Sequence, residues 1–139
     1  MSRIRRITSP AVPEPPAGLW SNGLLVDGIL YLSGFTARGA AGKALAEADM
    51  LDQARVIFGK MRALLEAAGG STTDVVKLTI FVTDITQREA VWQARREFFT
   101  GDFPACSLVE VSALAEPSIL VEIEGVAHIG AGTGGALPG

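Results

Sequence analysis

Two residues in the last third of the sequence have side chains that could carry out chemistry. Cys106, in the segment FPACSLVEV, is the single cysteine of the chain, and a thiolate can act as a nucleophile. Glu122 lies between Val121 and Ile123 in a strand-like segment, where burying an unpaired carboxylate costs too much free energy. We therefore expect Glu122 to be paired or to line a cleft, where it could act as a general acid or base on a bound water.

Each of these residues also has a simpler interpretation. A nearby carboxylate raises the pKa of a thiol, and the sequence has no Cys/His pairing pattern, so pocket lining or inert burial stays open for Cys106. Glu122 could instead form an ion pair at a subunit interface, as could Glu124 and Glu110. His128 has no second histidine with which to form a metal site or a triad, so we expect it at a surface.

The composition of the chain indicates a globular protein and argues against membrane and nucleic-acid-binding proteins. A chain of 139 residues that is 48% hydrophobic, with a net charge of −3, is typical of one globular domain. It has no apolar run long enough to cross a bilayer, no signal-peptide pattern and no possible internal disulfide, so we expect a soluble, cytoplasmic protein. No basic stripe with interleaved aromatic residues is present, so we expect neither nucleic acid nor a membrane as a partner.

The first half of the chain predicts a hairpin and a helix. Asp27-Gly28 accepts the backbone angles of a type I′ turn and lies between two apolar runs, which predicts strands over about 19–26 and 29–34. From Glu47 onward, apolar residues recur at steps of three and four until a Gly-Gly pair, which predicts a long amphipathic helix.

The second half predicts three strands and another helix. The alternating segment DVVKLTIFVTD predicts a strand, and Thr86 with Glu89 predicts a capping box that opens a helix through Phe99. Strands over about 105–111 and 119–127 complete the order ββαβαββ. This order predicts an α+β fold with one mixed sheet and two helices packed on one face.

Alternation along the strands predicts which side chains share a face. The face toward the helices would carry Val76, Ile80, Val109, Val111, Val121 and Ile123. The opposite face would carry Cys106 and Glu122, together with Phe81, Leu108, Leu120 and Val126. Two helices cover only one face, and this second face has too much apolar area to leave in water. We therefore expect another subunit to cover it.

Several separated motifs resemble the RidA/YjgF family of imine and enamine deaminases. They are YLSG, LLEAAGGSTTDVVKLTIFVTD, REFF, FPACSLVEV and VEIEGVA, and the resemblance covers residues 15–128. It implies a single domain with the chorismate-mutase-like ββαβαββ fold and a homotrimer with clefts between subunits. Residues 1–14 would form an N-terminal lead and 129–139 a glycine-rich tail, which we expect to be disordered.

The same resemblance implies a set of site residues and no metal or organic cofactor. Glu122 matches the glutamate that family members associate with the hydrolytic water, and Ser33 matches a serine that lines the site. The family's carboxylate-binding arginine, its tyrosine, a glutamine and an asparagine fall respectively on Cys106, Trp20, Phe35 and Trp92.

The replaced arginine changes the expected substrate. A guanidinium binds a carboxylate through two charge-assisted hydrogen bonds, and a neutral thiol at Cys106 cannot do so. We therefore expect a hydrolase or deaminase that acts on an imine, enamine or related group of a bulky, hydrophobic small molecule. Glu122 would activate water, Ser33 would offer a hydrogen bond, and the other residues would shape the pocket. A non-catalytic ligand- or partner-binding trimer, an ordinary 2-iminopropanoate deaminase and cysteine-dependent chemistry at Cys106 are the alternatives.

Overall fold

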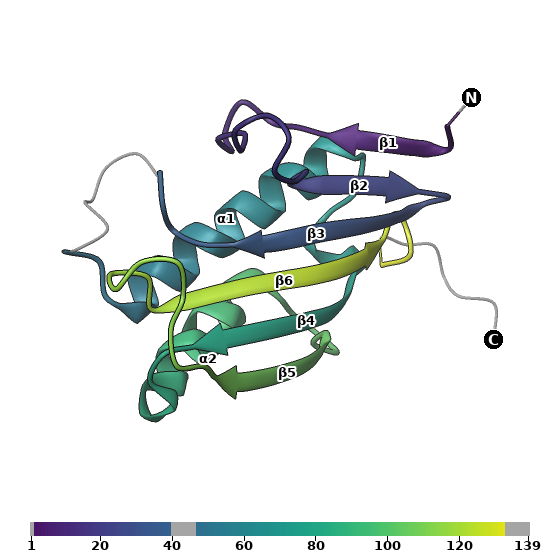
Figure 1. Cartoon of the computed structure of the whole chain (residues 1–139). Helices are drawn as coiled ribbons and strands as arrows, with labels where there is room; N and C mark the ends of the chain where they lie inside the picture. Colours follow the sequence, from purple (N-terminus) through teal and green to yellow (C-terminus); the bar gives the residue numbers. More distant parts are fainter. Residues whose placement is uncertain (1, 40–46, 133–139) are drawn as a thin grey trace.

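The computed structural model describes residues 2–39 and 47–132. Its six strands form one mixed sheet in the order β1-β2-β3-β6-β4-β5, and both helices lie against the same face (Figure 1). The strands are β1 (Ile4–Ile7), β2 (Gly23–Val26), β3 (Ile29–Phe35), β4 (Val75–Val82), β5 (Ala105–Glu110) and β6 (Val121–His128), and the helices are α1 (Met50–Ala67) and α2 (Arg88–Phe98). Neighbouring strands are antiparallel except for the parallel pair β4 and β5. The predicted α+β fold class is confirmed.

Strand β1 lies within residues 1–14, the segment that we predicted to be an N-terminal lead. It pairs antiparallel with β2 and forms an edge of the sheet. Its sequence, IRRI, carries two arginines, and of its four side chains only that of Ile7 is buried. An edge strand with so little buried surface has no alternating pattern from which it could be predicted.

The predicted turn between β2 and β3 is confirmed, because Asp27 (φ 51°) and Gly28 (φ 81°) both have the positive φ of a type I′ turn. The first strand of this hairpin, however, begins at Gly23 and not near residue 19. The preceding segment, PEPPAG, ends in a turn with Gly18 at φ 86°, which keeps the following residues out of the sheet.

Helix α1 confirms the first predicted helix. Its N-cap, Asp49, accepts a hydrogen bond from the backbone N–H of Asp52 at 2.8 Å, and the Asp52 carboxylate reaches back to the Asp49 N–H. The helix ends where Gly69 adopts φ 86° and the N–H of Gly70 donates to the carbonyl of Leu65.

The capping box predicted for the second helix, at Thr86 and Glu89, is wrong. A short 3₁₀ turn, Ile85–Gln87, precedes α2, and Asp84 caps this turn by accepting from the Thr86 backbone N–H and hydroxyl. The Thr86 hydroxyl therefore donates to Asp84 and does not cap a helix. The charged carboxylate of Asp84 is a stronger hydrogen-bond acceptor than the neutral hydroxyl of Thr86, so Asp84 is the residue that caps this turn.

Side-chain orientation in β6 agrees with the prediction, but that in β5 does not. Val121 and Ile123 are buried toward the helices, with Glu122 on the opposite face. In β5, Cys106 and Leu108 pair with residues of β4 whose side chains are fully buried, so both point toward the helices. Because β5 is an edge strand with apolar side chains on both faces, its alternation alone does not show which face is covered.

A second error in orientation concerns Val76, which we predicted to face the helices. The pairing of β4 with β6 shifts register between Val75 and Lys77, so Val75 is buried there and Val76 is 43% exposed. The sheet face without helices therefore carries a partly exposed apolar set, namely Tyr31, Phe81, Val109 and Val126.

Candidate active site

A cavity of about 870 Å³ lies where the end of β3 meets the start of β6. Four of the six predicted site residues line it: Trp20, Ser33, Phe35 and Glu122. Residues of the predicted lead and the loop after it also form part of its wall. The predicted site residues Trp92 and Cys106 do not line this cavity.

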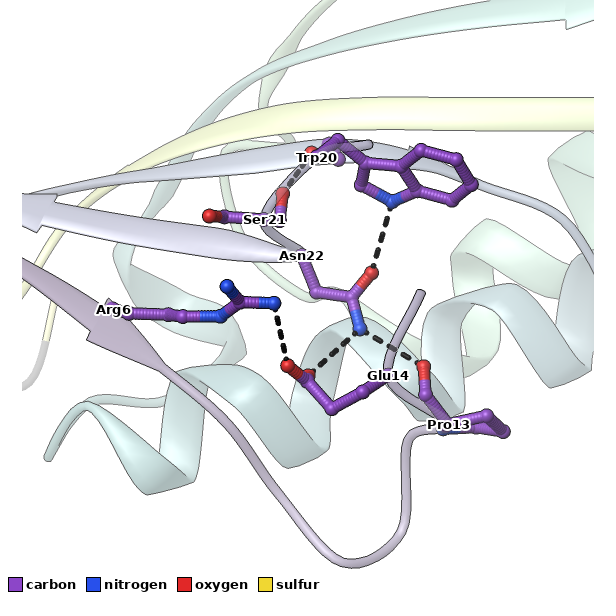
Figure 2. Close-up of polar contacts among 7 residues, drawn as sticks. Arg6, Pro13, Glu14, Trp20, Ser21 and Asn22 are labelled. Atoms are coloured by element: carbon purple, nitrogen blue, oxygen red, sulfur yellow. Dashed lines mark hydrogen bonds and ion pairs between the residues drawn. The ribbon is translucent and has the colours of Figure 1, made fainter. Parts of the chain in front are cut away.

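Trp20 is held beside the cavity by a chain of polar contacts (Figure 2). Its indole N–H donates to the side-chain oxygen of Asn22 at 3.3 Å, and the Asn22 amide donates to the carbonyl of Pro13 and to Glu14. Arg6, from β1, donates to the other oxygen of Glu14 at 2.7 Å. Because Asn22 is only 4% exposed, this network rigidly links the first strand to the indole.

Ser33 and Phe35 contribute to the cavity from β3. The Ser33 hydroxyl donates to the carbonyl of Ser21, so its hydrogen is used within the fold and its oxygen is the group that can accept a further bond. Phe35 pairs with Ile123 and is almost fully buried in the core. Phe35 therefore packs the cavity floor and offers little surface to a ligand.

Glu122 reaches the cavity across the backbone of Gly34. A β-carbon added at Gly34 would lie 2.5 Å from Glu122 Oε2 and 3.0 Å from its carboxyl carbon. The register of β3 against β6 shifts here, between Leu32 and Phe35, which gives the strand its local irregularity. The missing side chain at position 34 thus provides the space in which the carboxylate lies.

Burial raises the pKa of Glu122, the like charge of Glu124 raises it further, and the positive charge of Arg38 opposes both effects. No residue in the described part of the chain forms a hydrogen bond or ion pair with this carboxylate. Glu122 is therefore a half-buried acid that holds its proton to a higher pH than an ordinary glutamate, and it faces open space. This combination suits a group that both donates and accepts a proton.

Two cationic residues of the cavity, Arg38 and Lys60, were not predicted. The Lys60 ammonium donates to the carbonyls of Thr36 and Arg38 at 2.7 and 2.8 Å, and burial is the main cause that lowers its pKa. Arg38 lines the cavity and pairs with Glu116 at 3.0 Å. Lys60 lies in a helix and Arg38 in a loop, and no local sequence pattern indicates that the two residues line the same cavity.

The remaining predicted site residues form a second group between α2 and β5. The Arg95 guanidinium lies over the Trp92 ring. Burial raises the pKa of the Cys106 thiol, and the positive charge and hydrogen bonding of Arg95 oppose this effect without reversing it. Cys106 pairs with Leu78 and Glu122 with Phe81, residues that lie on opposite faces of β4. The prediction that Cys106 and Glu122 share a sheet face is therefore wrong.

The other predicted acids and the histidine have different surroundings. Glu110 faces the helix side of β5 and accepts a hydrogen bond from the N–H of Ile85, so it does not share the face of Glu122. His128 is exposed at the end of β6, as predicted. Within residues 2–39 and 47–132, no group of three or more His, Cys, Asp or Glu could hold a metal ion. In the same ranges no helix has the length and apolar composition needed to cross a membrane.

The fold is α+β, with two helices on one face of a mixed sheet and a cavity whose wall includes the Glu122 carboxylate. A family model described as "Endoribonuclease L-PSP" matches residues 11–129. The chain belongs to this family, the RidA/YjgF family, as its motifs predict.

Relatives of this chain are similar over almost their full length. A 2-iminobutanoate/2-iminopropanoate deaminase of Dermatophagoides farinae is 34% identical over 129 residues, which are 93% of this chain and 99% of the relative. A crystal structure of a protein of unknown function from Pseudomonas aeruginosa is 42% identical with a TM-score of 0.84, over 99% and 100% of the two chains. The structure of RidA from an Antarctic Psychrobacter is 29% identical with a TM-score of 0.80, over 90% and 99%.

Proposed function

We propose that this protein is a hydrolase that deaminates an imine, enamine or related group of a bulky, hydrophobic small molecule, with water activated by Glu122. The observation that carries the proposal is the unpaired, half-buried Glu122 carboxylate with a raised pKa at the wall of a cavity. The name of the deaminase from Dermatophagoides farinae supports the reaction class.

The proposed reaction needs one acid that gives up a proton and takes one back in each of two stages. Protonated Glu122 gives its proton to the imine nitrogen, water attacks the imine carbon, and the carboxylate takes the proton that the water loses. The carbinolamine then receives a proton on nitrogen from Glu122, its C–N bond breaks, and its hydroxyl proton returns to Glu122 as the carbonyl forms. The sum is imine plus water giving a carbonyl compound plus ammonia, with Glu122 restored.

The cavity favours a ligand with an apolar body. Its volume of about 870 Å³ is within the roughly 300–1,000 Å³ of small-molecule pockets. Trp20 and Leu19, both partly exposed, and three prolines of the preceding loop line one side, while Glu122 and Ser33 supply polar atoms. These residues suit a hydrophobic substrate that is oriented by a few polar contacts.

A homotrimer would complete the site. The open sheet face presents Tyr31, Phe81, Val109 and Val126, an apolar area that a second copy of the chain could cover. Within one chain, Cys106 and Trp92 do not line the cavity of Glu122. In the trimer, Cys106 and Trp92 of one subunit would lie beside the Glu122 cavity of the next. We place this trimer in the cytoplasm, where a free cysteine stays reduced.

The test is the release of ammonia from 2-imino acids that an amino-acid oxidase generates from phenylalanine and from alanine. Faster hydrolysis of the phenylalanine product supports the proposal. Faster hydrolysis of the alanine product would identify an ordinary 2-iminopropanoate deaminase instead. Hydrolysis of neither compound, together with measurable binding of a 2-oxo acid, would identify a non-catalytic binding trimer instead.

A further inference from the structure

A cation without an anionic partner lies outside the cavity of Glu122, between α2 and β5. The guanidinium carbon of Arg95 is 4.3 Å from the ring centroid of Trp92 and 5.4 Å from that of Phe103. Contact with two rings limits the positions that the guanidinium can take.

The hydrogen bonding of Arg95 is incomplete. Its Nε is the one buried side-chain nitrogen or oxygen without a hydrogen-bond partner in residues 2–39 and 47–132. By contrast, Arg55 on α1 binds both oxygens of Glu97, at 2.8 and 2.7 Å. No carboxylate in the described ranges forms an ion pair with Arg95. A buried donor without an acceptor costs free energy, so Arg95 is an exception among the buried polar side chains of the described residues.

The surroundings of Arg95 are positively charged. Arg95 and Lys77 both act on the half-buried thiol of Cys106 as positive charges. The Lys77 ammonium donates to the Ser107 hydroxyl at 3.3 Å and forms no ion pair with a described carboxylate. Two cations and two aromatic rings around one thiol make a local environment that attracts an anion with an apolar body.

We propose that Arg95, stacked on Trp92 and Phe103, binds the carboxylate of a small hydrophobic acid beside Cys106. The planar guanidinium matches a carboxylate through two N–H donors, and the rings contact the apolar remainder of the ligand. The inference deepens the proposed function by adding that the substrate carries a carboxylate as well as a large apolar group. It depends on the proposed function for the reaction only.

The test compares an acid with its neutral isostere. Isothermal titration calorimetry measures binding of phenylacetate and of phenylacetamide to wild type, Arg95→Gln and Arg96→Gln. Arg96 is the next residue of the same helix, is 58% exposed and lies 4.0 Å from Glu89, so it is the matched control for loss of one charge. Wild type and Arg96→Gln should prefer the acid by about 10- to 100-fold, and Arg95→Gln should lose this preference.

Cys106 provides a second readout, because it is the only thiol in the chain. Phenylacetate should slow its alkylation by iodoacetamide in wild type and leave the rate in Arg95→Gln unchanged. Equal affinity of wild type for acid and amide, or an unchanged preference in Arg95→Gln, would overturn the inference. Preference for the acid that depends on Arg95, without any imine turnover by wild type, would sustain this subsite and reject the proposed reaction.

Discussion

The carboxylate of Glu122 lies against the backbone of Gly34, in the space that the β-carbon of any other residue would occupy. That β-carbon would be 2.5 Å from Glu122 Oε2, closer than two such atoms approach without repulsion. The position of the proposed catalytic acid on β6 therefore depends on a glycine in a neighbouring strand. Turnover should be sensitive to a single methyl group at position 34.

Gly34→Ala should fold and lose turnover. The group in contact is the end of a flexible side chain, so Glu122 can move aside, but a displacement on the scale of 1 Å lowers kcat/KM by about 10²-fold. Gly59→Ala is the matched control, because Gly59 lies inside α1 with no atom within 4 Å of an added β-carbon. It should keep full turnover and raise the unfolding free energy by roughly 0.5–1 kcal/mol. Wild-type kcat/KM in Gly34→Ala would contradict this account.

Glu122→Gln should change stability in a pH-dependent way. The pKa of Glu122 is raised in the folded state, so the folded protein binds this proton more tightly than the unfolded chain does. The stabilisation by the protonated acid is fully present below the ordinary pKa of 4.5 and is lost as the pH rises through the folded-state pKa. The uncharged glutamine should therefore raise the midpoint of thermal unfolding at pH 7 to 8, with no gain at pH 4.

Thermal unfolding followed by circular dichroism across this pH range measures the effect. Glu66→Gln, on the exposed side of α1, is the control for the loss of one negative charge. A glutamine variant at 122 that is less stable than wild type at pH 7, or equally stabilised at pH 4, would show that burial does not disfavour the charged form.

Gln53→Leu should destabilise the fold by about 2–5 kcal/mol, because each buried polar group left unpaired costs about 1–3 kcal/mol. The Gln53 side chain is fully buried, donates to the carbonyl of Ser118 at 2.8 Å and accepts from the N–H of Leu120 at 2.9 Å. These bonds hold the chain just before β6, which carries Glu122. Urea unfolding measures the loss, and Gln93→Leu on the exposed side of α2 should stay within about 0.5 kcal/mol. A loss below about 1 kcal/mol for Gln53→Leu would contradict this role.

The open sheet face predicts the oligomeric state. Sedimentation equilibrium at micromolar concentration should give the mass of three 14.5-kDa chains. Val109→Lys places a charge on the apolar set opposite the helices and should shift the protein toward the monomer. A wild-type monomer at that concentration would reject both the trimer and the site between subunits.

The elements with one buried face were predictable from the sequence. α1 and β6 each pack one face into the core and leave the other outside, so their apolar residues recur with a clear period. β5 lies at the sheet edge and has apolar side chains on both faces, and the register shift beside Val76 changes which residue is buried. The pairing of β4 with β5 and with β6 determines which side chains of these strands face the helices. This pairing cannot be deduced from the sequence of one short segment.

The same limit applies to the site. Glu122, Ser33, Trp20 and Phe35 were predicted from motifs, and the fold brings all four to one cavity. The role of Lys60 depends on the distance between α1 and the loop after β3, which only tertiary packing sets. Trp92 and Arg95 lie three residues apart in the predicted helix, a spacing that brings side chains together. The contact of Arg95 with Phe103 has no such sign, since Phe103 follows α2 in an irregular segment.

The most direct measurement of the central claim is the rate at which a 2-imino acid, generated from phenylalanine by an amino-acid oxidase, releases ammonia in the presence of each variant. Wild type should accelerate hydrolysis, and Glu122→Gln should lower kcat by about 10²- to 10⁴-fold, the usual contribution of a general acid or base. Glu124→Gln, the neighbouring carboxylate of the same strand, should retain turnover. Equal rates for wild type and Glu122→Gln, or no acceleration by wild type over buffer, would contradict the account.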